Sequence, residues 1–398
     1  MANGSHYQHP AVKEILAGLD KYTKVLHVLV GPRQTGKTTA ARQITDQWKG
    51  ESVFAAADAP LPPGPEWIHA QWDLALTKCG LRKKVLLVLD EIQKVRGWSE
   101  TVKLLWDKEL HERKGLSVLL LGSSALLVQK GLTESLTGRF FKHRCGHWSY
   151  PEMKAAFGWS LEEWIFFGGY PGSVQYRKKE SDWKKYVTDS LVETVLSRDV
   201  LQLQTVAKPA LLRHLFGLAA GYPAQIYSYN KMLGQLQDAG NTTTLAHYLK
   251  LLESAFIASG LESYRSGRVT KRGSSPKLIL WNNALVSAHS PLSFAQTKRD
   301  GSAWGRLVEN AVGSHLLNHL NIPWDEVFYW RDHDKEVDFV VKKGIKTWAL
   351  EVKSGKNASG VGLEAFLKKN PKAKVLMIGT GGMDLEEFFQ SDPSQLLA

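Results

Sequence analysis

The sequence VLHVLVGPRQTGKT, residues 25–38, decides the fold of the first part of the chain. Its apolar run, 25–30, ends at Gly31 and leads into a loop that closes with Gly36, Lys37 and Thr38, matching the pattern G-x-x-x-x-G-K-[ST]. In this pattern the N–H groups of the loop and of the following helix bind phosphate groups. We therefore expect a nucleoside triphosphate site, the alternative being a glycine-rich turn that carries a surface lysine.

Each loop position has an expected role. Gly31 and Gly36 allow backbone turns and close approaches that a Cβ atom would obstruct. Lys37 would reach the β- and γ-phosphates, and the Thr38 hydroxyl would bind Mg²⁺. The residues expected to contact the nucleotide are Gly31, Pro32, Arg33, Gln34, Thr35, Gly36, Lys37, Thr38 and Thr39.

Two further apolar runs, 85–89 and 117–121, read as buried parallel strands, with helix-like segments at 38–49 and 99–112. This alternation predicts an open α/β sheet with its ligands at the carboxyl ends of the strands. Asp90 and Glu91 stand at such an end. Asp90 would hold the Mg²⁺ ion and Glu91 would orient the attacking water, unless both are surface acids that cap a strand.

The third strand is followed by Ser123 and then by a helix-like segment from about 124 to 137. Ser123 would sense the γ-phosphate or the water, or else it caps that helix. Arg139 follows the helix, where it would reach the nucleotide of a neighbouring subunit and neutralise charge in the transition state. The alternative for Arg139 is a surface arginine near a helix C-terminus.

Bulk composition limits the class of protein. With 398 residues, the chain should form two to four domains. Its formal charge of +12 favours a polyanionic partner. The only cysteines, Cys79 and Cys145, lack metal-ligand spacing and indicate a reducing compartment. Without a membrane-length apolar run or a signal-peptide core, a cytoplasmic protein with no membrane partner is expected.

The pattern changes after a glycine-rich breaker, FFGGYPG at 166–172, which we expect to act as a hinge or lid. From about 205 to 272, three helix-like runs and the segment IASGLESYRS predict a helix-turn-helix with a winged hairpin. Partly exposed side chains of the third helix would contact nucleic acid, and a basic loop would bind phosphates, unless the unit serves only for subunit packing. The helix candidates are Thr243, Thr244, His247, Tyr248 and Lys250, and the loop candidates are Arg265, Arg268, Lys271 and Arg272.

The last part of the chain predicts a second cluster of charged residues. Glu309 lies on the inward face of a helix at about 305–320, and two strands follow around Gly344. If Gly344 and Ile345 form a two-residue hairpin loop, the register places Asp338 opposite Glu351. Lys353 shares the face of Glu351, because side chains alternate along a strand. Facing carboxylates need a cation between them, either Lys353 or a divalent ion such as Mg²⁺.

Eight segments, in one order, closely resemble a bacterial and archaeal group of AAA-type P-loop ATPases. Members of this group carry a C-terminal domain related to PD-(D/E)XK nucleases. The resemblance covers about 10–355 and implies use of ATP and an AAA-like assembly, such as a hexameric ring. It also supports the nucleotide roles of Lys37, Thr38, Asp90, Glu91 and Ser123. The segments are GPRQTGKT, LVLDEIQKV, LLGSS, LTGRF, FGGYPG, LSRDV, LILWNNAL and ALEVKSG. RCGHWSYPEM, 144–153, departs from the more apolar strand usual in the group.

The tail acids match the D…E-x-K arrangement of these nucleases. Glu309, Asp338 and Glu351 would bind metal there, and Lys353 would position the water. A remnant that binds nucleic acid without cleaving it is the alternative, since a fold does not guarantee activity.

We therefore expect an α/β protein in four parts. These are an AAA-type P-loop ATPase domain (1–148), a helical lid (149–204), a winged-helix-like domain (205–274) and a PD-(D/E)XK nuclease-like domain (275–398). The favoured function is Mg-ATP hydrolysis by a homo-oligomer that acts on duplex or branched DNA as a motor or remodeller, through translocation or branch migration. The alternatives are an ATP-gated, Mg²⁺-dependent DNA nuclease and a nucleotide-switched sensor or scaffold in defence or signalling.

Overall fold

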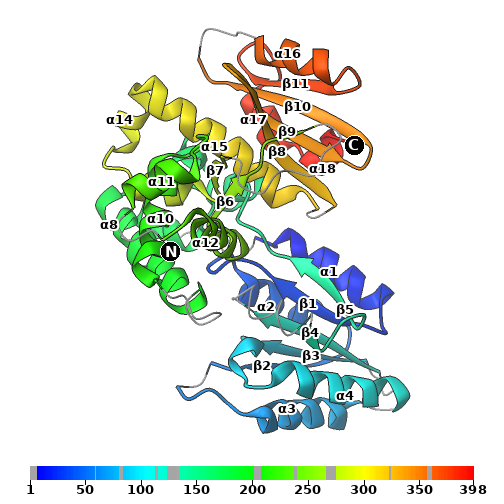
Figure 1. Ribbon diagram of the computed structural model, residues 1–398. Helices are drawn as coiled ribbons and strands as arrows, with labels where there is room; N and C mark the ends of the chain where they lie inside the picture. Colours follow the sequence, from blue (N-terminus) through cyan, green and yellow to red (C-terminus); the bar gives the residue numbers. More distant parts are fainter. Residues whose placement is uncertain are drawn as a thin grey trace. The chain divides into compact units, whose positions relative to one another are not determined.

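The computed structural model divides the chain into two compact units (Figure 1). Unit 1 is Asn3–Gly146 and unit 2 is His147–Ala398. The structure describes residues 7–58, 60–79, 84–112, 115–122, 132, 134–200, 208–236, 240–265, 275–321, 324–355 and 361–398. Within these ranges, no helix combines the length and the apolar character that crossing a membrane requires.

Unit 1 is built on a five-stranded sheet in the order β2-β3-β4-β1-β5, in which every pair is parallel. The strands predicted at 25–30, 85–89 and 117–121 are confirmed as β1, β3 and β4, and all three are buried almost throughout. The edge strand β5 exposes Phe141 and Lys142. The strands are β1 (Leu26–Val30), β2 (Glu51–Ala56), β3 (Val85–Asp90), β4 (Leu116–Gly122) and β5 (Phe140–Arg144).

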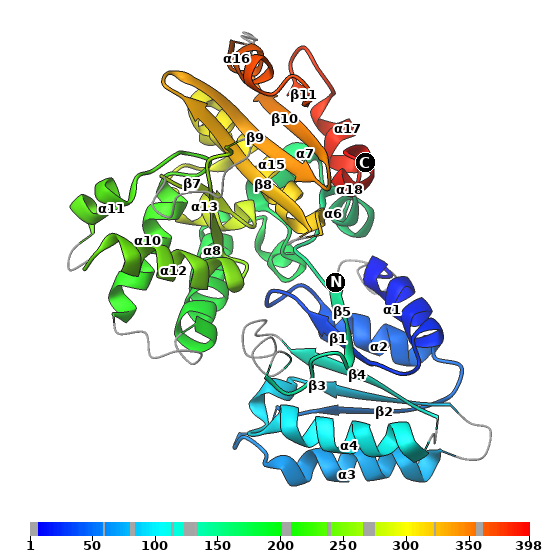
Figure 2. The same ribbon diagram turned by 45° about the vertical axis from the view of Figure 1, so that its right-hand side comes forward.

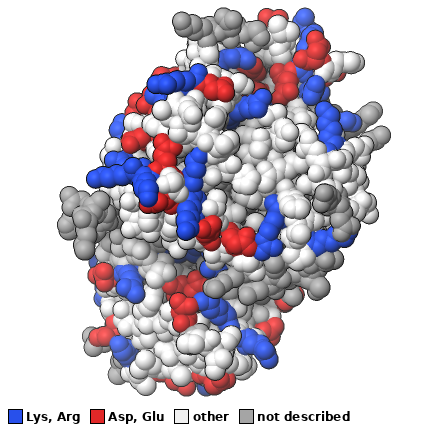
Figure 3. All heavy atoms as spheres, turned by 90° about the vertical axis from the view of Figure 1, so that its left-hand side faces the viewer, with Lys and Arg blue, Asp and Glu red and all other residues white. Residues whose placement is uncertain are grey.

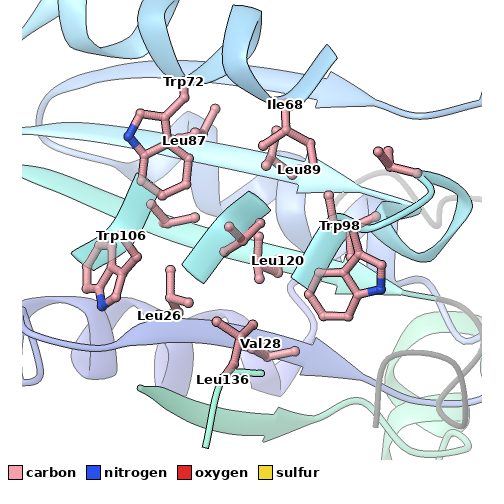
Figure 4. Close-up of a cluster of buried hydrophobic side chains, with 14 of the residues drawn as sticks. Leu26, Val28, Ile68, Trp72, Leu87, Leu89, Trp98, Trp106, Leu120 and Leu136 are labelled. Atoms are coloured by element: carbon pink, nitrogen blue, oxygen red, sulfur yellow. The ribbon is translucent and has the colours of Figure 1, made fainter. Parts of the chain in front are cut away.

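Helices cover both faces of this sheet (Figure 2). α1 (Pro10–Lys21) and α2 (Lys37–Gln47) share one buried apolar cluster with the strands. α3 (Pro65–Lys78) and α4 (Trp98–Glu112) share another, and Figure 4 shows their Trp72 and Trp106 among leucines of the sheet. The helices predicted at 38–49 and 99–112 are thus confirmed as α2 and α4, whereas most of the one expected at 124–137 lies outside the described residues.

Unit 2 begins with short helical segments. They are α6 (Tyr150–Phe157), α7 (Leu161–Phe167), η3 (Pro171–Tyr176), α8 (Glu180–Lys185), η4 (Tyr186–Val192) and η5 (Val195–Val200). Three helices follow where the sequence predicts them: α10 (Pro209–Gly221), α11 (Tyr229–Gln235) and α12 (Thr242–Ser254). Next come β6 (Ala258–Leu261) and β7 (Lys277–Leu280), which pair antiparallel. The identification of this arrangement as a winged helix stays a prediction.

One residue expected to face solvent on α12 is buried. Tyr248 is 4% exposed, and its hydroxyl oxygen accepts a hydrogen bond from the Lys208 N–H at 3.1 Å, so it packs inward instead of facing a ligand. Thr243, His247 and Lys250 are exposed, as predicted. Of the expected phosphate-binding loop only Arg265 is described; Arg268, Lys271 and Arg272 lie outside the described residues.

The rest of unit 2 combines helices with a four-stranded sheet in the order β11-β10-β9-β8. The hairpin of β9 and β10 pairs Lys343 with Lys346, which confirms the predicted register. α16 packs on this sheet through Leu363 and Phe366. The elements are α13 (Asn283–His289), α14 (Phe294–Arg299), α15 (Gly301–His319), β8 (Asp325–Asp332), β9 (Lys335–Lys343), β10 (Lys346–Lys353), α16 (Val361–Lys369), β11 (Lys374–Gly379), α17 (Leu385–Gln390) and α18 (Pro393–Leu396).

A group of asparagines, the asparagine cluster (Asn282, Asn283, Asn310 and Asn318), ties the parts of unit 2 together. The side-chain oxygen of Asn282 accepts from the Gly169 N–H at 3.0 Å. The Asn283 amide donates to the carbonyl oxygens of Ile165 and Leu307, at 2.7 and 2.8 Å. Buried hydrogen bonds therefore hold the glycine-rich segment expected to be a hinge. The predicted division of 149–398 into three parts stays a prediction.

Candidate nucleotide-binding site

The loop between β1 and α2 is held in shape by contacts inside unit 1. A Cβ atom at Gly31 would lie 1.8 Å from the carbonyl oxygen of Cys145, so only glycine fits there. Gly36 has a φ of 88°, in the left-handed region that glycine adopts without strain. Thr35 is fully buried, and its hydroxyl donates to the Pro32 carbonyl oxygen at 3.0 Å. The loop is therefore preformed, with the N-terminus of α2 at its end.

Lys37 is the first residue of α2 and is buried. Its ammonium donates to the carbonyl oxygens of Gly31 and Pro32, at 3.1 and 2.5 Å. Burial lowers the pKa of Lys37, whereas Cys145, Glu91 and Asp90 act in the opposite direction. Because peptide carbonyls are weaker acceptors than phosphate oxygens, this ammonium would form stronger hydrogen bonds with a polyphosphate.

Thr38 and Asp90 meet at the carboxyl end of the sheet. The Thr38 hydroxyl donates to Asp90 Oδ2 at 2.7 Å, and the Glu91 N–H donates to Asp90 Oδ1 at 2.8 Å. Burial raises the pKa of Asp90, and its hydrogen bonds act against that shift. A hydroxyl and a carboxylate are the hard oxygen ligands that Mg²⁺ takes beside phosphates, so this pair fits the ion that the sequence predicts.

Glu91, next to Asp90, has an unusual backbone for a residue with a side chain. Its φ of 54° and ψ of 34° lie in the left-handed region. Its carboxylate accepts a hydrogen bond from the Gln93 amide at 2.7 Å and lies 4.0 Å from the Lys94 ammonium. Strained conformations of this kind gather at functional sites, which agrees with a role for Glu91 in orienting water.

The other loop residues surround the same turn. Gln34 and Thr39 are exposed, and Arg33 is half-buried. Contacts of all nine loop residues with a nucleotide stay a prediction. Ser123, the expected sensor, lies outside the described residues.

Arg139 lies at the opposite end of the sheet from the loop. Its carbonyl oxygen accepts from the Leu26 N–H at the start of β1, whereas the loop follows the end of β1. The guanidinium binds Asp107 of α4 through Nε to Oδ1 at 2.7 Å and Nη2 to Oδ2 at 3.1 Å. A strand of five residues separates the two sites by about 16 Å, so Arg139 does not serve the loop of its own copy. Action on a neighbouring copy stays a prediction, and Asp107 is a partner that sequence reasoning missed.

The residues predicted in the tail do come together, in what we call the acid cluster: Glu309, Glu336, Asp338 and Glu351 with Lys277 and Lys353. Lys353 Nζ lies 2.5 Å from Glu351 Oε1, as their shared face predicts. Asp338 Oδ2 accepts from the Val352 N–H at 2.8 Å, on the strand that carries Glu351. Burial and the charge of Asp338 raise the pKa of Glu351.

Sequence reasoning missed two members of the cluster: Glu336 and, at its centre, Lys277. It is completely buried, and its ammonium lies 2.5 Å from Glu309 Oε1, 3.2 Å from Glu336 Oε1 and 3.5 Å from Asp338 Oδ1. The sequence feature that could have indicated a buried lysine is its position at the start of the apolar run KLILW, 277–281. The predicted divalent ion does not fit here, because the carboxylates already face an ammonium. Among the described residues, no group of three or more His, Cys, Asp or Glu side chains has the arrangement to hold a metal ion.

Comparison with known protein families agrees with the geometry of unit 1. Residues 23–154 match a family described as "AAA domain". Residues 158–296 and 304–390 match two families described as domains of unknown function, DUF8612 and DUF4143. The chain therefore contains an AAA-type P-loop ATPase domain, a class that binds nucleotides and usually Mg²⁺.

Relatives along the chain are distant. An uncharacterized protein of Mycobacterium tuberculosis is 25% identical over 333 residues, which cover 82% of this chain and 69% of the relative. One from Methanocaldococcus jannaschii is 24% identical over 342 residues, covering 79% of this chain and 72% of the relative. Among solved structures, a Walker-type ATPase of Pyrococcus abyssi aligns with a TM-score of 0.46 and 14% identity, covering 71% of this chain and 95% of that one.

Proposed function

We propose that the chain hydrolyses ATP at the loop between β1 and α2, and that a homo-oligomer, such as a hexameric ring, applies this reaction to DNA as a motor or remodeller. The observation that carries the hydrolysis is the 2.7 Å hydrogen bond that brings Thr38 of the loop to Asp90 of β3. It unites the phosphate-binding loop and the two acids in one site. Mg²⁺ held by Thr38 and Asp90 would neutralise charge on the phosphate oxygens.

The other residues of this site divide the chemistry between them. The ammonium of Lys37 would leave the carbonyl oxygens of Gly31 and Pro32 and bind the β- and γ-phosphates. Glu91 would orient the attacking water and accept its proton, which requires its carboxylate to leave the amide of Gln93.

Action on DNA is supported by charge and by the helices of unit 2. The net charge of +12 favours a polyanion, and α12 exposes His247 and Lys250. On the face drawn in Figure 3, basic and acidic side chains are interspersed instead of forming one broad basic patch. If DNA binds to this face, we expect it to be held by a few local contacts, with a weaker salt dependence than a large basic surface would give.

The test measures ATP hydrolysis by the full chain with and without duplex, branched and single-stranded DNA. We expect Glu91→Gln to bind ATP without turning it over, and wild-type hydrolysis to rise with one DNA form. Normal hydrolysis by Glu91→Gln would refute the role of Glu91. A rate that ignores every DNA form would refute the DNA-directed part while leaving the ATPase intact.

A nucleotide-switched sensor or scaffold is the second candidate. It is favoured by the hydrogen bond between Gln93 and Glu91, which holds the water-orienting carboxylate in place and would make hydrolysis slow. Very slow turnover with retained nucleotide, together with partner binding that depends on the nucleotide, would select this candidate. The ATP-gated nuclease has less support, because the acid cluster does not fit the metal ion that cleavage requires.

A further inference from the structure

The acid cluster of unit 2 has a cation built into it. Glu309 on α15 and Glu336 and Asp338 on β9 converge on the ammonium of Lys277, within 2.5 to 3.5 Å. That ammonium also donates to the main-chain carbonyl oxygen of Asp338 at 3.1 Å, and lies 5.1 Å from the centre of the Phe339 ring. Carboxylate oxygens are the ligand type that a divalent ion takes, but here the three carboxylates surround an ammonium instead.

We infer that Lys277 permanently occupies the place of a divalent ion, so that the acid cluster binds no metal in the natural chain. Removing its side chain would turn the cluster into a divalent-cation site. This inference concerns unit 2 and does not depend on the proposed ATPase function.

The backbone around Lys277 keeps its ammonium in the place that a divalent ion would take. The residue belongs to β7, whose backbone is held from two sides. Leu278 pairs with Gly260 of β6. The Leu280 N–H donates to the side-chain oxygen of Asn310 at 2.9 Å, and the Asn310 amide donates to the Leu280 carbonyl oxygen at 3.0 Å. Three carboxylates within 3.5 Å hold the ammonium in place, and its charge repels any divalent ion that approaches the same carboxylates.

The balance of charges in the acid cluster predicts the effect of removing the Lys277 side chain. Four carboxylates face two ammonium groups, those of Lys277 and Lys353. Without Lys277, three carboxylates would be left close together, with the Lys353 ammonium paired to Glu351, which favours binding of a hard cation. Lys277→Ala both removes the charge and leaves room for an ion, whereas Lys277→Met removes the charge but fills the space.

The experiment titrates the full chain, free of nucleotide, with Mn²⁺ and measures free Mn²⁺ by electron paramagnetic resonance. All proteins carry Asp90→Asn, which disables the ion site of unit 1. We expect no Mn²⁺ site in the parent protein. Lys277→Ala should have one Mn²⁺ site, with a dissociation constant at least tenfold lower than that of any binding by the parent. The double variant Lys277→Ala/Asp338→Asn should lose that site. Mn²⁺ should also raise the melting temperature of Lys277→Ala but not that of Lys277→Met.

Two results would overturn the inference. One is a Mn²⁺ site in the parent that Asp338→Asn removes, since the ammonium would then not exclude the ion. The other is a folded Lys277→Ala protein that binds no Mn²⁺. If Lys277→Ala does not fold, the parent and Asp338→Asn titrations decide: no Mn²⁺ site in the parent supports the inference, and a site that depends on Asp338 refutes it.

Discussion

The nucleotide site of unit 1 and the acid cluster of unit 2 are made from the same residue types but use them differently. In unit 1, the Lys37 ammonium donates to the peptide carbonyl oxygens of Gly31 and Pro32, and the charges of Asp90 and Glu91 act on it. In unit 2, Lys277 binds three carboxylates and is completely closed off from solvent. The charge of Lys37 is thus available to a phosphate, whereas that of Lys277 is satisfied inside the protein.

The comparison teaches that a matching set of residue types does not define a binding site. A site for a charged ligand must leave some charge or hydrogen-bonding capacity unsatisfied until the ligand arrives. A lysine whose charge is already paired with carboxylates inside the protein leaves little for a ligand to bind. The predictions below test this distinction, from the largest expected effect to the smallest.

Lys37→Ala should raise the dissociation constant for ATP by at least about 100-fold, because it removes the ammonium that the loop places to bind the phosphates. Isothermal titration calorimetry measures this change. The control is Lys103→Ala, at an exposed position of α4, which should bind ATP like the wild type. A Lys37→Ala protein with wild-type affinity would remove the distinction between the two lysines.

Glu309→Gln should change how the stability of the chain depends on pH. Burial raises the pKa of Glu309 above its ordinary value, and the Lys277 ammonium acts against that shift. The folded state therefore keeps a proton to higher pH than the unfolded chain does, and stability falls as pH rises through this window. Between pH 6 and pH 8 the wild type should lose more stability than Glu309→Gln.

Urea unfolding at the two pH values gives this difference. Glu364→Gln, at an exposed position of α16, is the matched control and should follow the wild type. Parallel pH curves for wild type and Glu309→Gln would mean that the acid cluster carries no extra proton at neutral pH.

His27 should give a pH dependence of the opposite sign in unit 1. It is buried beside His143, with 2.9 Å between His27 Nδ1 and His143 Nε2, and burial lowers its pKa from 6.5 to about 4. The unfolded chain takes up a proton as pH falls below 6.5, so stability is lost toward pH 4. Because water screens part of this effect, we expect a loss of about 1 kcal/mol between pH 6.5 and pH 5 that His27→Gln lacks.

The same urea measurement tests this prediction, with His69→Gln, at an exposed position of α3, as control. An unchanged slope in His27→Gln would assign the acid sensitivity of unit 1 to other groups.

Arg139 and Asp107 should have the smallest effect on stability. The pair is about one-third exposed on both sides, and such pairs contribute about 0.2–1 kcal/mol. Arg139→Ala and Asp107→Asn should therefore unfold at similar urea concentrations. If Arg139 acts on a neighbouring copy, only Arg139→Ala should lower ATP hydrolysis, by about tenfold or more. Equal activity of the two variants would leave Arg139 as a surface ion pair.

What could be predicted from the sequence depended on the distance along the chain between interacting residues. The loop of the nucleotide site is contiguous, so its pattern identified Lys37 and Thr38 directly. Asp90 was recognised because it ends an apolar strand, and the register of β9 and β10 followed from a two-residue turn. In each case a local rule sufficed.

The contacts that the sequence did not predict join residues that lie far apart in the chain. Lys277 belongs to a strand far before Asp338 in the chain and to a different sheet, so only the folded structure brings its ammonium to the carboxylates. Asp107, on α4, meets Arg139 across the end of another sheet. Tyr248 looked half-exposed by helical periodicity, but packing of α12 buries it and the Lys208 N–H binds its hydroxyl.

The short connection between the two units has a mechanical consequence. The carbonyl oxygen of Cys145 lies against Gly31, so that any Cβ there would collide with it. After Gly146 comes His147, whose imidazole contacts Asn282 at 3.0 Å and the Phe256 carbonyl oxygen at 3.1 Å. Two residues span at most about 7 Å, so the chain between these anchored points has almost no slack. Each end of this connection is thus anchored within its own unit, and Gly146 is the one residue between the two anchored positions.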